Sequence, residues 1–136
     1  MEANVKWVSG TTFKGTQDGH ELAMDLPEDA GGRNTGPKPK TLLLTALGGC
    51  TGLDVVSILE KMRVELDGFE MRLSAEQTEE HPKVFKAIHL TYVFSGRGLP
   101  MDKLERAVSL SQEKYCGVTA MLAKACPITY EIVVSE

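Results

Sequence analysis

The chain has 136 residues, enough for one globular domain with one hydrophobic core, and we expect residues 1–136 to form that domain. It carries a net charge of −4 and has only a short basic cluster, Arg33, Lys38 and Lys40. Because nucleic acid is bound by extended groups of lysine and arginine, this charge pattern excludes nucleic acid as an expected partner.

The N-terminal part of the chain predicts short strands followed by a loop. Apolar and polar residues alternate within residues 5–26, and Asp18-Gly19 is a strong hairpin signal. Residues 27–39 combine prolines and glycines without periodicity, which is typical of a loop. The first residues lack the apolar segment of a signal peptide, so we expect a cytoplasmic protein.

A long helix is predicted from Lys38 or Pro39 to Glu65. The N-terminal part of this helix is apolar on almost all of its faces, which indicates that other parts of the protein bury it on every side. A monomer of this size rarely covers such a helix alone, so we expect a second subunit to bury part of it. Gly48 and Gly52 would then let another helix approach closely. Polar interruptions favour a buried helix over a membrane span.

The C-terminal half predicts two strands, two helices and a last strand. Alternation indicates strands over 68–78 and 84–95, and Asp102 is expected to cap a helix that runs to about Glu113. A short helix over 117–125 and a strand beginning at Ile128 follow. This order predicts an α+β fold, with a mainly antiparallel sheet around the central helix.

Cys50 and Cys116 are the residues that point to chemistry. A thiolate that attacks a peroxide becomes a sulfenic acid, which a second thiol converts to a disulfide. Such a pair needs Cα atoms within about 7 Å of each other. Cys116, at an expected helix start, has an environment that favours a thiolate, whereas Cys50 lacks one unless a positive side chain reaches it.

Each thiol has a plainer interpretation as a small buried hydrophobe. Cys126, beside Pro127, is predicted to serve packing. The reducing cytoplasm disfavours a structural disulfide. The three histidines show no ligand spacing, so no metal is expected, and metal binding by both thiols and a histidine is the weakest alternative.

Two acidic residues lie near the thiols. Asp54 follows Cys50 by four residues and therefore faces the same side of the helix. It either supports the thiol or is a buried acid paired with a lysine or arginine, and we favour the ion pair. Glu113 either forms a hydrogen bond near Cys116 or is a solvated helix residue.

Three motifs carry a resemblance to a known family: Leu42-Leu-Leu-Thr-Ala-Leu-Gly-Gly-Cys50, Asp54-Val-Val56 and Ser111-Gln-Glu-Lys-Tyr-Cys116. Together with Lys6-Trp7 and Pro39, they resemble the OsmC/Ohr family (osmotically inducible protein C and organic hydroperoxide resistance protein). The resemblance covers nearly the whole chain. It is strongest to the OsmC-like branch with Glu-Lys-Tyr-Cys at the second cysteine.

The resemblance implies an OsmC-like fold in an intertwined homodimer, with active sites at the subunit interface. The two thiols would become neighbours when the protomers wrap together. It implies reduction of small hydrophobic hydroperoxides, with Cys50 as the attacking and Cys116 as the resolving cysteine. Electrons would come from a dithiol or a lipoylated protein, and no metal or organic cofactor is implied.

The sequence departs from the family pattern at the residues that activate the thiolate. Lys40 stands where the family has its glutamate, and Lys14 or Phe13 stands where it has its arginine. Lys14, Arg33 or Lys40 is left to supply a positive charge, although lysine lacks the forked geometry of arginine. This departure motivates an alternative function, a non-enzymatic dimer that binds a small hydrophobic ligand in the interface cleft.

Overall fold

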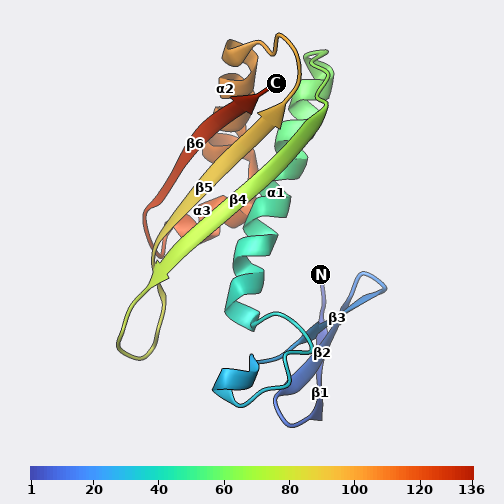
Figure 1. Ribbon diagram of the computed structural model, residues 1–136, viewed down its shortest axis with the longest axis vertical. Helices are drawn as coiled ribbons and strands as arrows, with labels where there is room; N and C mark the ends of the chain where they lie inside the picture. The colour runs from blue at the N-terminus through green and yellow to red at the C-terminus, as the bar shows by residue number, and fades with distance from the viewer. The chain divides into compact units, whose positions relative to one another are not determined.

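A computed structural model describes all 136 residues, and Figure 1 shows the course of the chain. The fold is α+β, as predicted, and its elements fall into two compact units, Met1–Leu43 and Leu44–Glu136. The single domain expected over residues 1–136 stays a prediction. The elements, in chain order, are β1 (Asn4–Ser9), β2 (Thr12–Gln17), β3 (His20–Met24), η1 (Glu28–Ala30), α1 (Pro39–Lys61), β4 (Gly68–Gln77), β5 (Phe85–Ser95), α2 (Met101–Leu110), η2 (Ser111–Tyr115), α3 (Gly117–Ala123) and β6 (Ile128–Ser135).

The first unit is an antiparallel sheet in the order β1-β2-β3. Asp18 and Gly19 connect β2 to β3, and their φ angles of 51° and 76° are both positive. Two positive φ angles define the tight turn that matches the twist of a hairpin, which is why Asp-Gly predicts it. The strands and the hairpin expected within residues 5–26 are confirmed.

Asp25 anchors the loop that follows this sheet. Its carboxylate is buried and accepts hydrogen bonds from the hydroxyls of Thr11, Thr12 and Thr35 and from the amides of Leu26 and Thr35. The hydrogen bond from Thr11, then that from Thr35, holds the pKa of Asp25 well below its ordinary value of 3.8. No sequence pattern pointed to this residue.

Replacing Asp25 with asparagine is expected to lower stability at neutral pH and to weaken its dependence on acid. A carboxyl whose pKa is lower in the folded state stabilises the fold above its unfolded pKa, here 3.8, and loses that contribution as the pH falls further. Thermal unfolding from about pH 6 to about pH 2 measures both effects. If the variant and the natural protein lose stability equally on acidification, this role for Asp25 is wrong.

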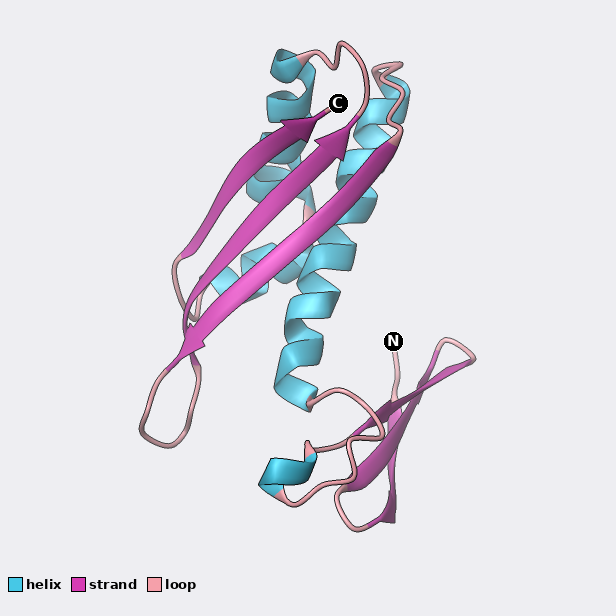
Figure 2. Cartoon of the chain, viewed as in Figure 1, coloured by secondary structure: helices cyan, strands magenta, loops and turns pink.

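The second unit places its helices against one face of the sheet β4-β5-β6, as Figure 2 shows. β4 and β5 are antiparallel, as predicted, but β6 runs parallel to β5. The reason is the long connection through α2, η2 and α3, which returns the chain to the start of β5 before β6 begins. The sheet of this unit is therefore mixed: the expected antiparallel pairing holds for β4 and β5, as it does throughout the first unit, but not for β6.

The part of α1 within the second unit has a buried and an exposed side. Leu47, Val55 and Leu59 are fully buried in the core, whereas Leu53 is 75% and Val56 47% exposed. By length and composition alone, α1 is apolar enough to cross a membrane, and Leu47, Val55 and Leu59 on its buried side belong to the core of the second unit. A β-carbon added to Gly48 would lie 2.8 Å from Leu73 Cδ1, so a strand of the same chain, not another helix, needs that glycine.

α1 ends four residues before the predicted Glu65. The amide of Val64 donates to the carbonyl of Leu59 and that of Arg63 to the carbonyl of Glu60, with Arg63 at a φ of 60°. This pair of bonds is a Schellman motif, which normally uses glycine at the left-handed position. Because arginine occupies that position, the sequence carried no stop signal.

α2 also differs from its prediction. It begins at Met101, after Pro100, so Asp102 lies in the first turn and caps nothing with its side chain. There its charge favours the positive end of the helix. The helix ends at Leu110, and one turn of π-helix, η2, occupies the residues up to Tyr115. Such turns occur frequently at functional sites.

Candidate functional site

The two thiols singled out in the sequence meet inside one protomer. Cys50 lies on α1, and Cys116 lies between η2 and α3. Cys50 packs against the core cluster that contains Cys116, and it raises the pKa of Cys116 both by hydrogen bonding and by charge, so the two side chains are neighbours. Neither is in a disulfide. The thiols were expected to become neighbours once two protomers wrap together, but the second unit of one protomer already brings them together.

The backbone on both sides holds Cys116 in place. Its amide donates to the carbonyl of Ser111 at 2.9 Å, across the π-helical turn. Its Sγ accepts a hydrogen bond from the amide of Thr119 at 3.3 Å. The residue is 3% exposed and belongs to the core. The thiol is therefore fixed by η2 before it and by the first turn of α3 after it.

Burial raises the pKa of Cys116 above its ordinary value of 9.0. The nearby hydroxyl of Thr119 and the hydrogen bond from its amide lower the pKa, and Cys50 raises it further. The helix start does favour a thiolate, as expected, but the loss of water around the sulfur outweighs this effect. Cys116 is therefore a protonated thiol at neutral pH.

A chain of buried and partly buried side-chain hydrogen bonds links the segments that carry the thiols. The Thr51 hydroxyl lies 2.7 Å from both the Tyr92 and the Ser111 hydroxyls. Ser111 donates to Asp54 Oδ2 at 2.9 Å, and the Gln112 amide donates to the Tyr92 hydroxyl at 2.6 Å. Five side chains from α1, β5 and η2 are thus linked in one chain.

The direction of this chain follows from counting protons, because a hydroxyl has one to donate. Ser111 gives its proton to Asp54, so Thr51 must donate to Ser111 and Tyr92 must donate to Thr51. Tyr92 in turn accepts from Gln112. Burial raises the pKa of Tyr92 above 10.0, so its hydroxyl keeps its proton at neutral pH. Every donor in the chain therefore points toward the carboxylate of Asp54.

The structure corrects the expectation for Asp54 and agrees with one of the two interpretations of Glu113. The partner of Asp54 is the neutral Ser111 hydroxyl, not a lysine or arginine. Glu113 is exposed, in keeping with a solvated residue, and its neighbour Gln112 makes the buried contact. Ser111 thereby joins two elements: its hydroxyl bonds Thr51 and Asp54 on α1, and its carbonyl accepts from the amide of Cys116.

Sequence reasoning missed Thr51, Tyr92, Ser111 and Gln112. One signal was present, since Thr51 interrupts the stripe Leu47, Val55 and Leu59 at four-residue spacing. A polar residue in a buried stripe must find a partner. The partners themselves come from segments more than forty residues away and leave no local trace.

A cavity of about 450 Å³ adjoins this chain at Asp54. Such a volume suits a small organic ligand. The cavity is lined mainly by apolar side chains of α1 and α2, with Tyr115 beside them; its lining is Leu53, Asp54, Ser57, Ile58, Lys61, Met62, Leu110 and Tyr115.

The candidate activating cations lie in the first unit. Lys14 pairs with Glu21 at 3.3 Å on the neighbouring strand, and Arg33 donates to the Ser9 hydroxyl at 3.1 Å. Lys40 is the second residue of α1. The role of these three residues in activating a thiolate stays a prediction.

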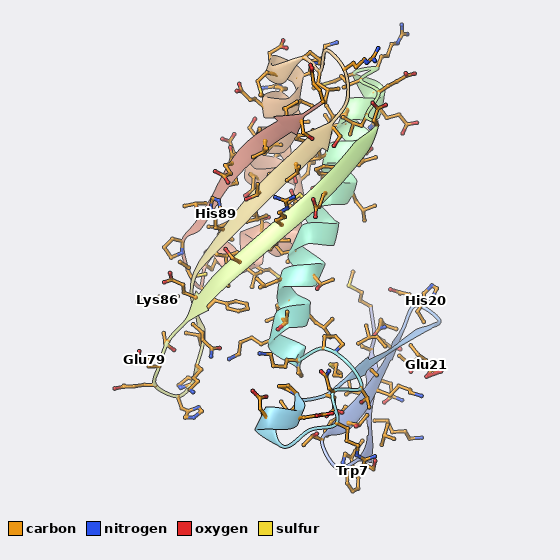
Figure 3. All side chains as sticks on the ribbon, in the orientation of Figure 1. Trp7, His20, Glu21, Glu79, Lys86 and His89 are labelled. Carbon is orange, nitrogen blue, oxygen red and sulfur yellow. The ribbon has the colours of Figure 1, made fainter.

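The remaining cysteine and the histidines make other contacts. Cys126 is buried in the core, as packing requires. His89, on β5, has its Nδ1 2.7 Å from the Thr129 hydroxyl, and Figure 3 shows His89 on this strand. No group of three or more histidine, cysteine or acidic residues is arranged to hold a metal ion.

Comparison with known proteins gives consistent matches. The family model described as "OsmC-like protein" matches residues 31–131. Protein YhfA of Escherichia coli strain K12 is 44% identical, with 98% of each chain covered. The crystal structure of a hypothetical protein from Aquifex aeolicus is 34% identical, covers 99% of this chain and 97% of its own, and has a TM-score of 0.83. The organic hydroperoxide resistance protein OhrB of Bacillus subtilis is 20% identical, with 97% and 98% covered and a TM-score of 0.65.

Proposed function

Because the chain belongs to the OsmC-like protein family, we propose that it is a thiol-dependent peroxidase that reduces organic hydroperoxides in defence against oxidative stress. The observation that carries the proposal is the contact between two unpaired thiols, Cys50 and Cys116, in one protomer. The name of the Bacillus subtilis neighbour, an organic hydroperoxide resistance protein, agrees with it.

In the proposed reaction, the Cys50 thiolate attacks one oxygen of the hydroperoxide. The O–O bond breaks, Cys50 becomes a sulfenic acid, and the leaving alkoxide takes a proton to give an alcohol. The Cys116 thiolate then attacks the sulfenic sulfur, forming the disulfide and releasing hydroxide, which is protonated to water. A dithiol, free or on a lipoylated protein, reduces the disulfide and becomes oxidised itself.

The cavity beside Asp54 supports a hydrophobic substrate. Leu53, Ile58 and Met62 give it an apolar wall, suited to the organic part of a hydroperoxide. Asp54 on the lining of the cavity accepts a hydrogen bond from Ser111, and Ser111 is bonded in turn to Thr51, which directly follows Cys50 in the sequence. The cavity is therefore our proposed place for the substrate's apolar group.

We further propose that the protein acts as a homodimer in the cytoplasm. Leu53 and Val56 leave an apolar surface on α1 that a second copy would cover. Lys14, Arg33 and Lys40 remain the candidate sources of positive charge for the thiolate, in place of the arginine and glutamate of the family pattern. No nucleic acid, membrane, metal or organic cofactor enters the proposal.

A peroxide titration of the reduced protein tests the function. One equivalent of cumene hydroperoxide per chain is expected to remove two free thiols and leave one, because Cys50 and Cys116 pair while Cys126 stays buried. Thiol counting and intact mass, with a loss of two hydrogens, measure this result. Three free thiols after the same treatment would show that this chain is not such a peroxidase.

The same cavity also favours the second candidate function, binding of a small hydrophobic ligand without chemistry. In that case native mass spectrometry of freshly purified protein finds an organic ligand on each chain, and the peroxide titration leaves all three thiols free. The two functions therefore give opposite thiol counts.

A further inference from the structure

Thr119 has a buried hydroxyl that nothing in the reduced protein uses. The residue is 4% exposed, and its Oγ1 is a buried polar atom without a hydrogen-bond partner. An unpaired hydroxyl away from water is unfavourable, and such groups are rare in native proteins. This hydroxyl therefore calls for a state of the protein in which it has a partner.

The usual local partners of such a hydroxyl are already engaged. Thr119 is the third residue of α3, where a side chain often bonds the amide of the capping residue. That capping residue is Cys116, and its amide already donates to the carbonyl of Ser111. The Thr119 amide, in turn, donates to Cys116 Sγ. The capping role thus belongs to the backbone of Thr119 and leaves its hydroxyl free.

The nearby acceptor that changes during the proposed reaction is Cys116 Sγ. A thiol is a weak acceptor, whereas a thiolate is a full negative charge that accepts strongly. The Thr119 hydroxyl lies close enough to lower the pKa of Cys116, although it makes no hydrogen bond to the sulfur in the reduced state. The other titratable groups that face Cys116 are Cys50 on α1 and Tyr92 on β5.

We propose that Thr119 is a further catalytic residue, whose hydroxyl donates a hydrogen bond to the Cys116 thiolate as this forms to resolve the Cys50 sulfenic acid. The inference rests on the proposed function, since the thiolate is needed for the disulfide-forming step. The hydroxyl keeps its own proton throughout. The proton of Cys116 leaves with the hydroxide released from Cys50, which becomes water.

The role explains why Cys116 can be buried and still react. Burial keeps the resolving thiol protonated and inert until the sulfenic acid forms beside it. Two donors from Thr119, the amide and the hydroxyl, then compensate the charge that water cannot reach. The unpaired hydroxyl lowers the stability of the resting protein. This unfavourable contribution disappears when the Cys116 thiolate forms and accepts a hydrogen bond from the hydroxyl.

Two variants separate the hydroxyl from the shape of the side chain. Thr119→Val removes the hydroxyl at nearly constant volume, and Thr119→Ser keeps it. Protein labelled with carbon-13 at cysteine Cβ reports the ionisation of Cys116 by NMR as the pH rises. We expect Thr119→Val to lower the thiolate fraction of Cys116 about tenfold at a given pH, a shift of about one pH unit, and Thr119→Ser to restore it.

Thermal unfolding of the reduced protein distinguishes this role from a structural one. Removing an unpaired buried hydroxyl is expected to leave the melting temperature of Thr119→Val unchanged or higher, whereas loss of a structural hydrogen bond would lower it. An unchanged ionisation midpoint in Thr119→Val, or a failure of Thr119→Ser to restore it, would overturn the inference.

The titration needs no peroxide, so it is independent of the proposed function. If the midpoint shifts as expected but cumene hydroperoxide leaves all thiols free, the peroxidase function fails while the hydrogen bond to the thiolate stands. If the function holds, stopped-flow measurement of disulfide formation after one equivalent of peroxide is expected to be about tenfold slower in Thr119→Val at neutral pH, because less thiolate is present.

Discussion

Replacing Cys50 with serine is expected to abolish the consumption of organic hydroperoxide. A serine hydroxyl is not ionised at neutral pH and does not attack the O–O bond as a thiolate does, so turnover falls by at least about a thousandfold. The substitution changes one atom and leaves the packing of α1 against β4 intact. Consumption of cumene hydroperoxide with dithiothreitol as reductant measures the loss.

Replacing Cys116 with serine provides the matched comparison. The attack on peroxide then still occurs once, but the sulfenic acid on Cys50 has no thiol beside it, so it accumulates and is trapped by dimedone. Mass spectrometry identifies the adduct on the peptide that contains Cys50. Cys126→Ser is the control. Cys126 lies in the core, so its replacement is expected to leave the rate of peroxide consumption unchanged.

The two variants also test which thiol does which step. If Cys116→Ser consumes no peroxide and Cys50→Ser yields a dimedone adduct on Cys116, the roles are reversed. Burial argues against that outcome, because it raises the pKa of Cys116 and keeps this thiol protonated. Retention of full turnover by Cys50→Ser would remove Cys50 from the mechanism altogether.

The sequence predicted those parts of the fold that have local signals. Asp18-Gly19 marked a hairpin and alternation marked β4 and β5, because these patterns act within a few residues. The end of α1 was missed because Arg63 adopts a conformation that usually marks glycine. The parallel direction of β6 was missed because it depends on how α2 and α3 return the chain, which no short pattern encodes.

The site was predicted in the same uneven way. Cys50 and Cys116 were identified from the residues that surround them in the sequence. Their meeting within one protomer depends on η2, a turn that hydrophobic periodicity does not predict. Asp54 was expected to pair with a cation because a half-buried charge usually does. In the structure, hydroxyl groups take the place of the cation. Thr51 and Ser111 lie side by side only in the folded protein, so the sequence did not predict these hydrogen bonds.

Ser111 contributes both to the stability of the core and to the proposed function. The hydroxyl of Ser111 contacts Thr51 on α1, and its carbonyl holds the amide of Cys116. A shift of η2 relative to α1 would therefore move one thiol away from the other. Since disulfide formation requires a narrow range of distances, the chain sets the geometry of the reaction as well as the packing of the core.

Thr51→Val is accordingly expected to produce the largest loss of stability among substitutions in the chain. It leaves the Tyr92 hydroxyl without an acceptor and the Ser111 hydroxyl without a donor, both in the buried core. Each unsatisfied group costs about 1–3 kcal/mol, so the free energy of unfolding falls by about 2–6 kcal/mol. Urea unfolding of the reduced protein, followed by circular dichroism, measures the change.

Thr91→Val is the matched control, because Thr91 makes an exposed hydrogen bond to Glu131 on the other face of the sheet. Its effect is expected to stay within about 0.5 kcal/mol. In Thr51→Val the rate of disulfide formation after peroxide is also expected to fall, since η2 loses its attachment to α1. Equal stability of the two variants would show that the buried chain does not hold the core together, and an unchanged rate would show that it does not position Cys116.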